Sequence, residues 1–250
     1  MSGTCPTPST LLSHPISSQI HYLLSGTFNT IFLYLLAFNP STSTLSIHKK
    51  IPAQGPHQFL ALSPDRATVY ATTWAKEPSL SAWNVVEGGT GLEWINTVPI
   101  TATSSYIQVS EDTPSRIYSA GGPTGEVHSI DEKTGGFGEK LQELLYVPKD
   151  ELESADKTRV ALRYGSHGID INKARKQVLV PHLGHNSIFM YDMKTDGTLE
   201  LIADCKSFGE HDGPRHVVPS ADGDKFELCG RIQNPPHVSP PPPTSFDSST

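Results

Sequence analysis

The segment GPHQFLALSPDRATVYATTW (residues 55–74) decides the fold prediction, because its pattern returns three times along the chain. It begins with Gly-x-His, continues into a short apolar run, passes through a polar turn and ends in a second apolar run. The same order occurs in GSHGIDINKARKQVLVPHLG (165–184) and, with arginine in place of histidine, in GPRHVVPSADGDKFELC (213–229). SYIQVSEDTPSRIYSAGG (105–122) is a degenerate copy. A recurring strand–turn–strand unit indicates a chain built from successive copies of one β motif.

The spacing of these copies is typical of the blades of a β-propeller. The anchor residues His57, Tyr106, His167 and Arg215 are separated by 49, 61 and 48 residues. The long interval contains the charged stretch 147–164, which we expect to be an insertion that forms a short surface helix or an irregular excursion. A period in the high forties with several strands per period favours a propeller over a sandwich or a barrel.

Further short strands complete each predicted blade. SLSAWNVV (79–86) is one such run, and in SIFMYDMKTDGTLELIAD (187–204) two runs flank KTDGT, which has the composition of a hairpin turn. The run IFLYLLAF (31–38) is far too short to cross a bilayer as a helix and is expected to be a buried strand paired with HYLLSGT (21–27). The predicted fold class is therefore all-β, a propeller of four-stranded blades, of which residues 21–229 supply about four and a half.

The two ends of the chain differ in composition from the repeats. Residues 1–20 show no basic segment ahead of an apolar one, so we expect a flexible N-terminal segment and no secretory signal. Residues 230–250 are rich in proline and serine and are expected to be disordered, because proline lacks the N–H that a β-ladder needs. A half blade followed by this tail leads us to expect a propeller that is cut short, with a retained intron or a frameshift at the Cys229–Gly230 junction.

Composition excludes several classes of partner. The formal net charge is −7, so neither nucleic acid nor an anionic membrane surface is an expected partner. Cys5, Cys205 and Cys229 are far apart and form no CxxC pair, which argues against a disulfide framework and against a zinc site. We therefore expect a cytoplasmic protein, whose oligomeric state is left open.

The units SPD…VYATTW, YGSHGIDIN, HLGHNSIFMYD and DGPRHVVPSADG resemble motifs of the fungal 3-carboxy-cis,cis-muconate cyclase family. That family belongs to the lactonase-type seven-bladed propellers, together with 6-phosphogluconolactonase-like proteins. The similarity covers roughly residues 20–229. It implies an isomerase of aromatic catabolism (the β-ketoadipate pathway), an intramolecular lyase that closes a carboxylate onto a double bond to give a lactone. The implied ligand is a small anionic polycarboxylate or lactone, and no metal or organic cofactor is implied.

The resemblance also implies roles for particular residues. His167, in GSHG, falls on the family's acid/base histidine, and Arg215, in GPRH, falls on the arginine that binds or polarises a substrate carboxylate. Imidazole suits proton transfer near neutral pH, and guanidinium binds a carboxylate through two parallel hydrogen bonds. Both residues begin a blade's first strand, so we expect them on the channel wall of adjacent blades; the alternative is that each only bonds a neighbouring backbone carbonyl. His57 occupies the same repeat position and is a further candidate ligand of the substrate.

The remaining histidines are weaker candidates. His182 and His185 have H-x-x-H spacing but flank a glycine turn instead of sharing a helix face, so a turn-forming role is favoured over metal binding. Strand alternation should direct His216 away from Arg215, and His211 is not expected in the site either.

The sequence departs from the family pattern at its end. The family also uses a glutamate just beyond the strand that begins in KFELC, and an arginine in a later blade. The glutamate position falls near Arg231, Glu227 lies too early to replace it, and we expect no later blade to follow in this chain. We expect the loss of these groups to impair activity, because each contributes to transition-state stabilisation.

Three alternatives remain open beside a cyclase. A lactone hydrolase of the 6-phosphogluconolactonase-like family would use the same scaffold. A non-catalytic propeller fragment would expose unpaired strand edges and tend to associate. A WD-type scaffold is least favoured, because the repeats lack Trp-Asp endings.

Overall fold

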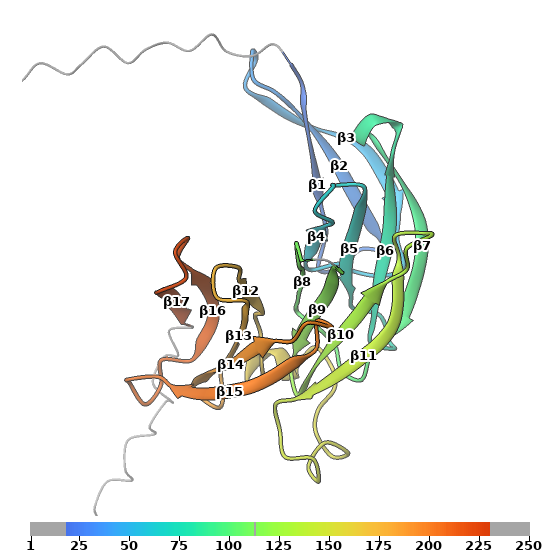
Figure 1. Ribbon diagram of the computed structural model, residues 1–250. Helices are drawn as coiled ribbons and strands as arrows, with labels where there is room; N and C mark the ends of the chain where they lie inside the picture. The colour runs from blue at the N-terminus through green and yellow to red at the C-terminus, as the bar shows by residue number, and fades with distance from the viewer. Residues whose placement is uncertain (1–18, 113, 231–250) are drawn as a thin grey trace, which may run out of the picture.

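The computed structural model describes residues 19–112 and 114–230, and within these ranges the chain is almost entirely antiparallel β-sheet (Figure 1). Five sheets follow one another in chain order, and in each sheet consecutive strands pair. The first sheet consists of β1 (His21–Ser25), β2 (Phe32–Asn39) and β3 (Thr44–Pro52). The second consists of β4 (Leu60–Leu62), β5 (Thr68–Thr73), β6 (Ser79–Val86) and β7 (Gly91–Pro99). The third consists of β8 (Tyr106–Val109), β9 (Arg116–Gly121), β10 (Thr124–Ile130) and β11 (Phe137–Leu145). The fourth consists of β12 (Asp170–Asn172), β13 (Gln177–His182), β14 (Ser187–Met193) and β15 (Leu199–Lys206), and the fifth of β16 (Pro214–Pro219) and β17 (Phe226–Gly230).

This architecture confirms the predicted all-β propeller of four-stranded blades. The sheets succeed one another around an arc, with β4, β8, β12 and β16 on its concave side and β7, β11 and β15 on its outer side (Figure 1). Among the described residues three sheets have four strands, the first has three and the fifth has two. The predicted strands SLSAWNVV and SIFMYDM coincide with β6 and β14, and β1 pairs with β2 as expected.

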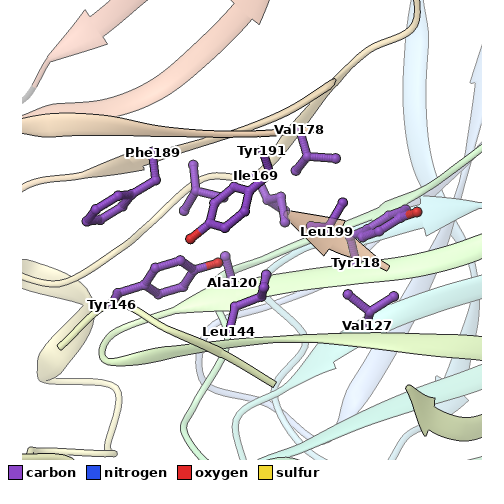
Figure 2. Packing of buried hydrophobic residues seen from close by; sticks show 11 residues of the cluster. Tyr118, Ala120, Val127, Leu144, Tyr146, Ile169, Val178, Phe189, Tyr191 and Leu199 are labelled. Carbon is purple, nitrogen blue, oxygen red and sulfur yellow. The ribbon is translucent and has the colours of Figure 1, made fainter. Parts of the chain in front are cut away.

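The hydrophobic core is divided into clusters that lie between successive sheets. One cluster joins the first and second sheets through Leu33, Leu35 and Trp83, and another joins the fourth and fifth through Leu179 and Val217. The cluster between the third and fourth sheets is drawn in Figure 2: Tyr118, Ala120, Val127 and Leu144 come from one sheet, and Val178, Phe189, Tyr191 and Leu199 from the next. Successive side chains of a strand point to opposite faces of its sheet. A sheet that has a neighbouring sheet on each side therefore buries apolar side chains on both faces.

Polar side chains link neighbouring blades at repeated positions. On the outer strands, Asn96 donates to the Phe137 carbonyl (2.7 Å) and accepts from its N–H (3.1 Å), and Gln142 makes the same pair of bonds with Leu199 one blade later (2.8 and 2.7 Å). Each amide therefore extends the hydrogen bonding of a sheet to the sheet that follows it.

Tyrosine hydroxyls make a second repeated link. Tyr70 on β5 donates to the Gly135 carbonyl (2.6 Å), and Tyr118 on β9 donates to the Gly197 carbonyl (2.9 Å). Both acceptors lie in the outer hairpin turn of the next blade, and both glycines have positive φ (75° and 84°), a conformation that favours glycine. The turn chemistry of one blade thus positions the acceptor for its neighbour.

We expect Tyr118→Phe to lower the free energy of unfolding by about 1 kcal/mol, because the buried link to Gly197 is lost while the ring stays packed. Urea denaturation measures the change. Tyr22→Phe is the matched control: that ring is 41% exposed, and its variant should differ from the parent by less than about 0.5 kcal/mol. Equal effects in the two variants would contradict the assignment of the link.

The stretch 147–164 is an excursion of turns and not a surface helix. Its only helical segment is the short 3₁₀ turn η2 (Ala161–Arg163), and a second 3₁₀ turn, η1 (Glu87–Gly89), joins β6 to β7. Asp156 explains the break: its carboxylate accepts the Thr158 N–H (2.8 Å) and the Tyr164 hydroxyl (2.9 Å), which competes with a helical path. No helix in the described part of the chain is long and apolar enough to cross a membrane.

Candidate functional site

Three aromatic rings come into contact where the chain enters the inner strands of the third, fourth and fifth sheets, and Arg215 lies close enough for its charge to lower the pKa of two of them. Tyr106 begins β8, His167 lies three residues before β12, and Arg215 and His216 lie near the start of β16. We call these four residues the channel group. Because the inner strands begin at corresponding points of the repeat, residues up to 110 positions apart in sequence are brought to one end of the concave surface.

The backbone of His167 is fixed from two blades. Its carbonyl accepts the Ser105 hydroxyl of the third blade (2.6 Å), and its N–H donates to the Pro181 carbonyl of its own blade (3.2 Å). The side chain is 3% exposed, and its Nδ1 has no hydrogen-bond partner among the described residues. A buried ring nitrogen without a partner is free to interact with a bound molecule.

Aromatic contacts connect His167 to the second blade. The His167 ring meets the His216 ring edge-on with centroids 5.0 Å apart, and His216 lies 5.6 Å from Tyr106. Tyr106 in turn stacks on Phe59, with centroids 3.7 Å apart. These contacts fix the rings of the channel group relative to one another.

The position of His216 differs from the sequence-based interpretation, which set it aside because strand alternation should direct it away from Arg215. The register of β16 against β17 shifts between Pro214 and His216, so Arg215 lies at an irregularity of the strand. Such a bulge breaks strict alternation. His216 therefore joins the group, and its ring is the one that contacts His167.

The electrostatics of the group favour an anionic ligand. Burial, followed by the charges of Arg215 and His216, lowers the pKa of His167 to about 3, and burial and Arg215 also lower the pKa of His216. Both imidazoles are therefore neutral near pH 7. Arg215 is half-buried and forms no ion pair with a carboxylate in the described ranges. A cation without a counterion beside two neutral rings is suited to bind a carboxylate.

Asp170, which the sequence analysis did not consider, lies beside the group. Burial raises the pKa of the Asp170 carboxyl to about 6. The pKa of Tyr106 is also raised, first by the burial of its ring and second by the charge of Asp170. A cavity of about 270 Å³ between β4, β8 and β12 is lined by Asp170, Gln108 and Phe59. The available signal in the sequence was an acidic residue between two isoleucines in the inner-strand segment GIDIN.

The structure does not bring His57 into the channel group. Its ring is fully buried, with Nδ1 3.0 Å from the Thr72 carbonyl oxygen and the ring edge-on to Trp83 at 4.9 Å. Trp83 belongs to the core between the first two sheets. His57 therefore has a packing role, although it occupies the same repeat position as His167.

Other candidates also lie apart from the group. His182 accepts the His185 N–H through Nδ1 (2.9 Å), which matches the expected turn-forming role, and the His185 Nε2 lies 3.0 Å from Asp204. No three metal-ligating side chains within the described ranges are grouped to hold an ion. His211 and Glu227 are exposed, and the expected glutamate position near Arg231 lies outside the described residues.

Buried histidines should make the protein sensitive to acid. Burial is the largest cause that lowers the pKa of His57, His128 and His182 to about 4 and that of His167 to about 3. An unfolded chain would protonate these residues near pH 6.5, whereas the folded protein would not. The stabilising effect of each histidine is fully present above pH 6.5 and is lost as the pH falls toward the folded-state pKa. By pH 5 the loss for each one amounts to about 2 kcal/mol.

Urea denaturation at pH 7 and pH 5 measures this loss. Asp170 offsets part of this loss. Its carboxyl pKa is raised in the folded state, so as the pH falls the folded protein binds a proton there before the unfolded chain does, which stabilises the fold. The variant His57→Gln should take up about one proton fewer on unfolding, seen as a shallower dependence of stability on pH. A free energy of unfolding that does not change between pH 7 and pH 5 would show that these histidines are not held neutral.

The amino-acid sequence matches a known protein family and several curated proteins. Residues 23–228 match the family described as "Lactonase, 7-bladed beta-propeller". The chain is 28% identical over 214 residues to Muconate cycloisomerase 1 of Cutaneotrichosporon cutaneum, covering 80% of this chain and 54% of that protein. It is 26% identical over 180 residues to an uncharacterized protein of Staphylococcus epidermidis, covering 69% and 49%. The chain thus spans about half the length of the curated relatives it matches.

Solved structures agree with this context at the level of the fold. A provisionally assigned 6-phosphogluconolactonase of Bacteroides uniformis aligns with a TM-score of 0.68 and 18% identity, over 86% of this chain and 62% of that one. The periplasmic gluconolactonase of Pseudomonas aeruginosa aligns with a TM-score of 0.68 and 15% identity, over 84% and 61%. At these identities the likeness concerns architecture and not chemistry.

Proposed function

Because the chain belongs to the lactonase family of seven-bladed β-propellers, we propose that its channel group closes an unsaturated polycarboxylate, such as 3-carboxy-cis,cis-muconate, to a lactone. The observation that carries the proposal is the buried, neutral His167 beside Arg215, a cation without a counterion in the described ranges. The relationship to Muconate cycloisomerase 1 over 80% of this chain supports the choice of reaction.

Arg215 holds the substrate. Its guanidinium forms two parallel hydrogen bonds with one carboxylate, which fixes that end of the molecule and keeps the double bond close to His167. Because the two residues come from adjacent blades, their separation is set by the packing of the fourth sheet on the fifth. The rings of His216 and Tyr106 lie in contact beside this pair of residues.

His167 moves the proton. In the closing reaction a carboxylate oxygen of the substrate bonds to one carbon of the double bond, and the π electrons take a proton at the adjacent carbon. The carboxylate that closes the ring loses its negative charge and the carbon gains one proton, so the lactone is an isomer of the substrate in its acid form. A bound polycarboxylate offsets the charge of Arg215 and so raises the pKa of His167, which lets the imidazole carry a proton from solvent to that carbon.

Lactone hydrolysis is the second candidate. Neutral imidazole is the form that a general base needs to activate water, and the neutral state of His167 favours this reading. Water would then add to the lactone carbonyl, the ring C–O bond would break and a hydroxy acid would form. Arg215 would hold the carboxylate or phosphate of the lactone in the same way.

Two assays separate the candidates. The 250-residue chain is incubated with 3-carboxy-cis,cis-muconate, where closure removes the conjugated diene absorbance, and with 6-phosphogluconolactone, where hydrolysis releases acid. We expect turnover of the muconate only. Turnover of the sugar lactone only would assign a hydrolase, and turnover of neither by the folded chain would overturn both functions. Arg215→Gln should raise KM, whereas Arg215→Lys should restore part of the affinity.

A further inference from the structure

We propose that the chain has a second binding pocket, separate from the channel group, that takes small planar carboxylates. A cavity of about 510 Å³ lies between the β5–β6 turn, which carries Trp74 and Lys76, and the excursion 147–164, which contributes Lys157 and Arg159. Its size is in the range of ordinary small-molecule sites. None of its lining residues belongs to the channel group.

The charges of this pocket favour an anion. Lys76, Lys157 and Arg159 line it together with one carboxylate, Glu77, so three positive charges face one negative charge. The Lys157 ammonium donates to the Glu153 carbonyl (3.0 Å), and neither Lys76 nor Arg159 forms an ion pair with a carboxylate in the described part of the chain. This local charge is positive, whereas the chain as a whole carries a net charge of −7. A concave site with an excess of positive charge raises the local concentration of anions.

Trp74 prepares the pocket for a planar ligand. The guanidinium carbon of Arg159 lies 4.9 Å from the centre of the Trp74 ring, and the indole N–H donates to the Ser104 carbonyl (2.9 Å). Phe28 meets the same indole edge-on at 5.5 Å. The ring is therefore fixed, and a contact with its π face holds Arg159 without using the N–H donors of the guanidinium. Those donors remain available to a carboxylate, while Trp74 and Pro78 offer apolar surface to the body of the ligand.

The excursion is hydrogen-bonded to the segment that precedes β8, so the wall of the pocket that it forms has a fixed position. The Thr103 N–H donates to the Lys157 carbonyl (2.9 Å), and Thr103 is itself buried. The segment that contains Thr103 continues to Ser105, whose hydroxyl holds the His167 backbone. The second pocket and the channel group therefore lie along one segment without sharing a side chain.

Isothermal titration calorimetry of the full chain with phthalate, a planar aromatic dicarboxylate, tests the proposal. We expect one site whose affinity falls at least tenfold in Arg159→Gln and in Lys76→Gln. Lys133→Gln, which removes a charge from the β10–β11 turn, is the matched control and should leave the affinity unchanged. Non-planar cyclohexane-1,2-dicarboxylate should bind more weakly, and inorganic sulfate more weakly still.

Three results would overturn the proposal. Phthalate affinity that is the same in Arg159→Gln and in the parent would exclude the pocket. Loss of binding in His167→Gln, with Arg159→Gln unaffected, would assign phthalate to the channel instead. Sulfate that binds as tightly as phthalate would show an unspecific attraction of anions. Because the readout is binding, it is independent of whether the chain turns over a muconate or a lactone.

Discussion

Replacement of His167 by glutamine is expected to lower kcat for lactone formation by a factor of about 10²–10⁴ while the protein stays folded, because this is the range that a positioned acid/base contributes. Glutamine is similar in length to histidine and neutral, as His167 is near pH 7, so the packing against His216 is largely kept. It carries no group that titrates near neutral pH. The loss of diene absorbance under saturating substrate measures kcat, and circular dichroism verifies the fold.

Two other histidines serve as controls for this result. His211→Gln changes an exposed residue and should alter kcat by less than about twofold. His57→Gln changes the residue at the matching position of another blade, and should lower the melting temperature while it leaves kcat of the folded protein unchanged. If His167→Gln retains the parental kcat, the role proposed for His167 is wrong. If His57→Gln loses activity without loss of stability, His57 takes part in the reaction and the packing role given to it is wrong.

Trp83→Ala is expected to lower the free energy of unfolding by about 3–5 kcal/mol, the largest effect of a single substitution on stability that we predict. Trp83 is 1% exposed and fills the space between the first two sheets, where it packs with Leu33, Leu35 and the His57 ring. Truncation would leave a cavity that the rigid strands on either side cannot close. Urea denaturation at pH 7 measures the loss.

The partner of Trp83 in the β6–β7 register provides a matched control. Trp94 lies opposite Trp83 on the neighbouring strand but is 55% exposed, and its indole N–H donates only to Thr97. Trp94→Ala should cost less than about 1 kcal/mol, because little apolar surface is buried there. Similar losses in the two variants would mean that the first two sheets are not joined by the core described above.

Much of the fold could be predicted from the sequence, because the signals of a meander are local. Alternating apolar residues and turn residues mark each strand, and β6 and β14 begin and end where the runs SLSAWNVV and SIFMYDM do. The repeat of about 48 residues then places one sheet after another. The links between sheets could not be predicted in this way. The amides of Asn96 and Gln142 bond to residues 41 and 57 positions away, and no local pattern shows such partners.

The candidate site shows the same limit. The family resemblance selected His167 and Arg215, and the repeat placed both near the start of an inner strand, but the repeat also selected His57, which packs inside the core. His57 lies in the core because its ring packs against Trp83, which comes from another strand of the same blade. His216 was misjudged because alternation assumes a regular strand, whereas β16 has an irregularity at Arg215. For 147–164 the sequence left a short surface helix and an irregular excursion both open, and the hydrogen bonds of Asp156 favour the excursion.

Turnover of 3-carboxy-cis,cis-muconate in D₂O, followed by proton NMR, tests the central claim most directly. The account predicts a lactone that carries one solvent deuteron on the carbon next to the new C–O bond, formed by the parent chain and not by His167→Gln. This label follows from a proton that His167 exchanges with solvent before delivering it to carbon. Unchanged muconate after incubation with the folded parent chain, or a lactone without deuterium at that carbon, would contradict it.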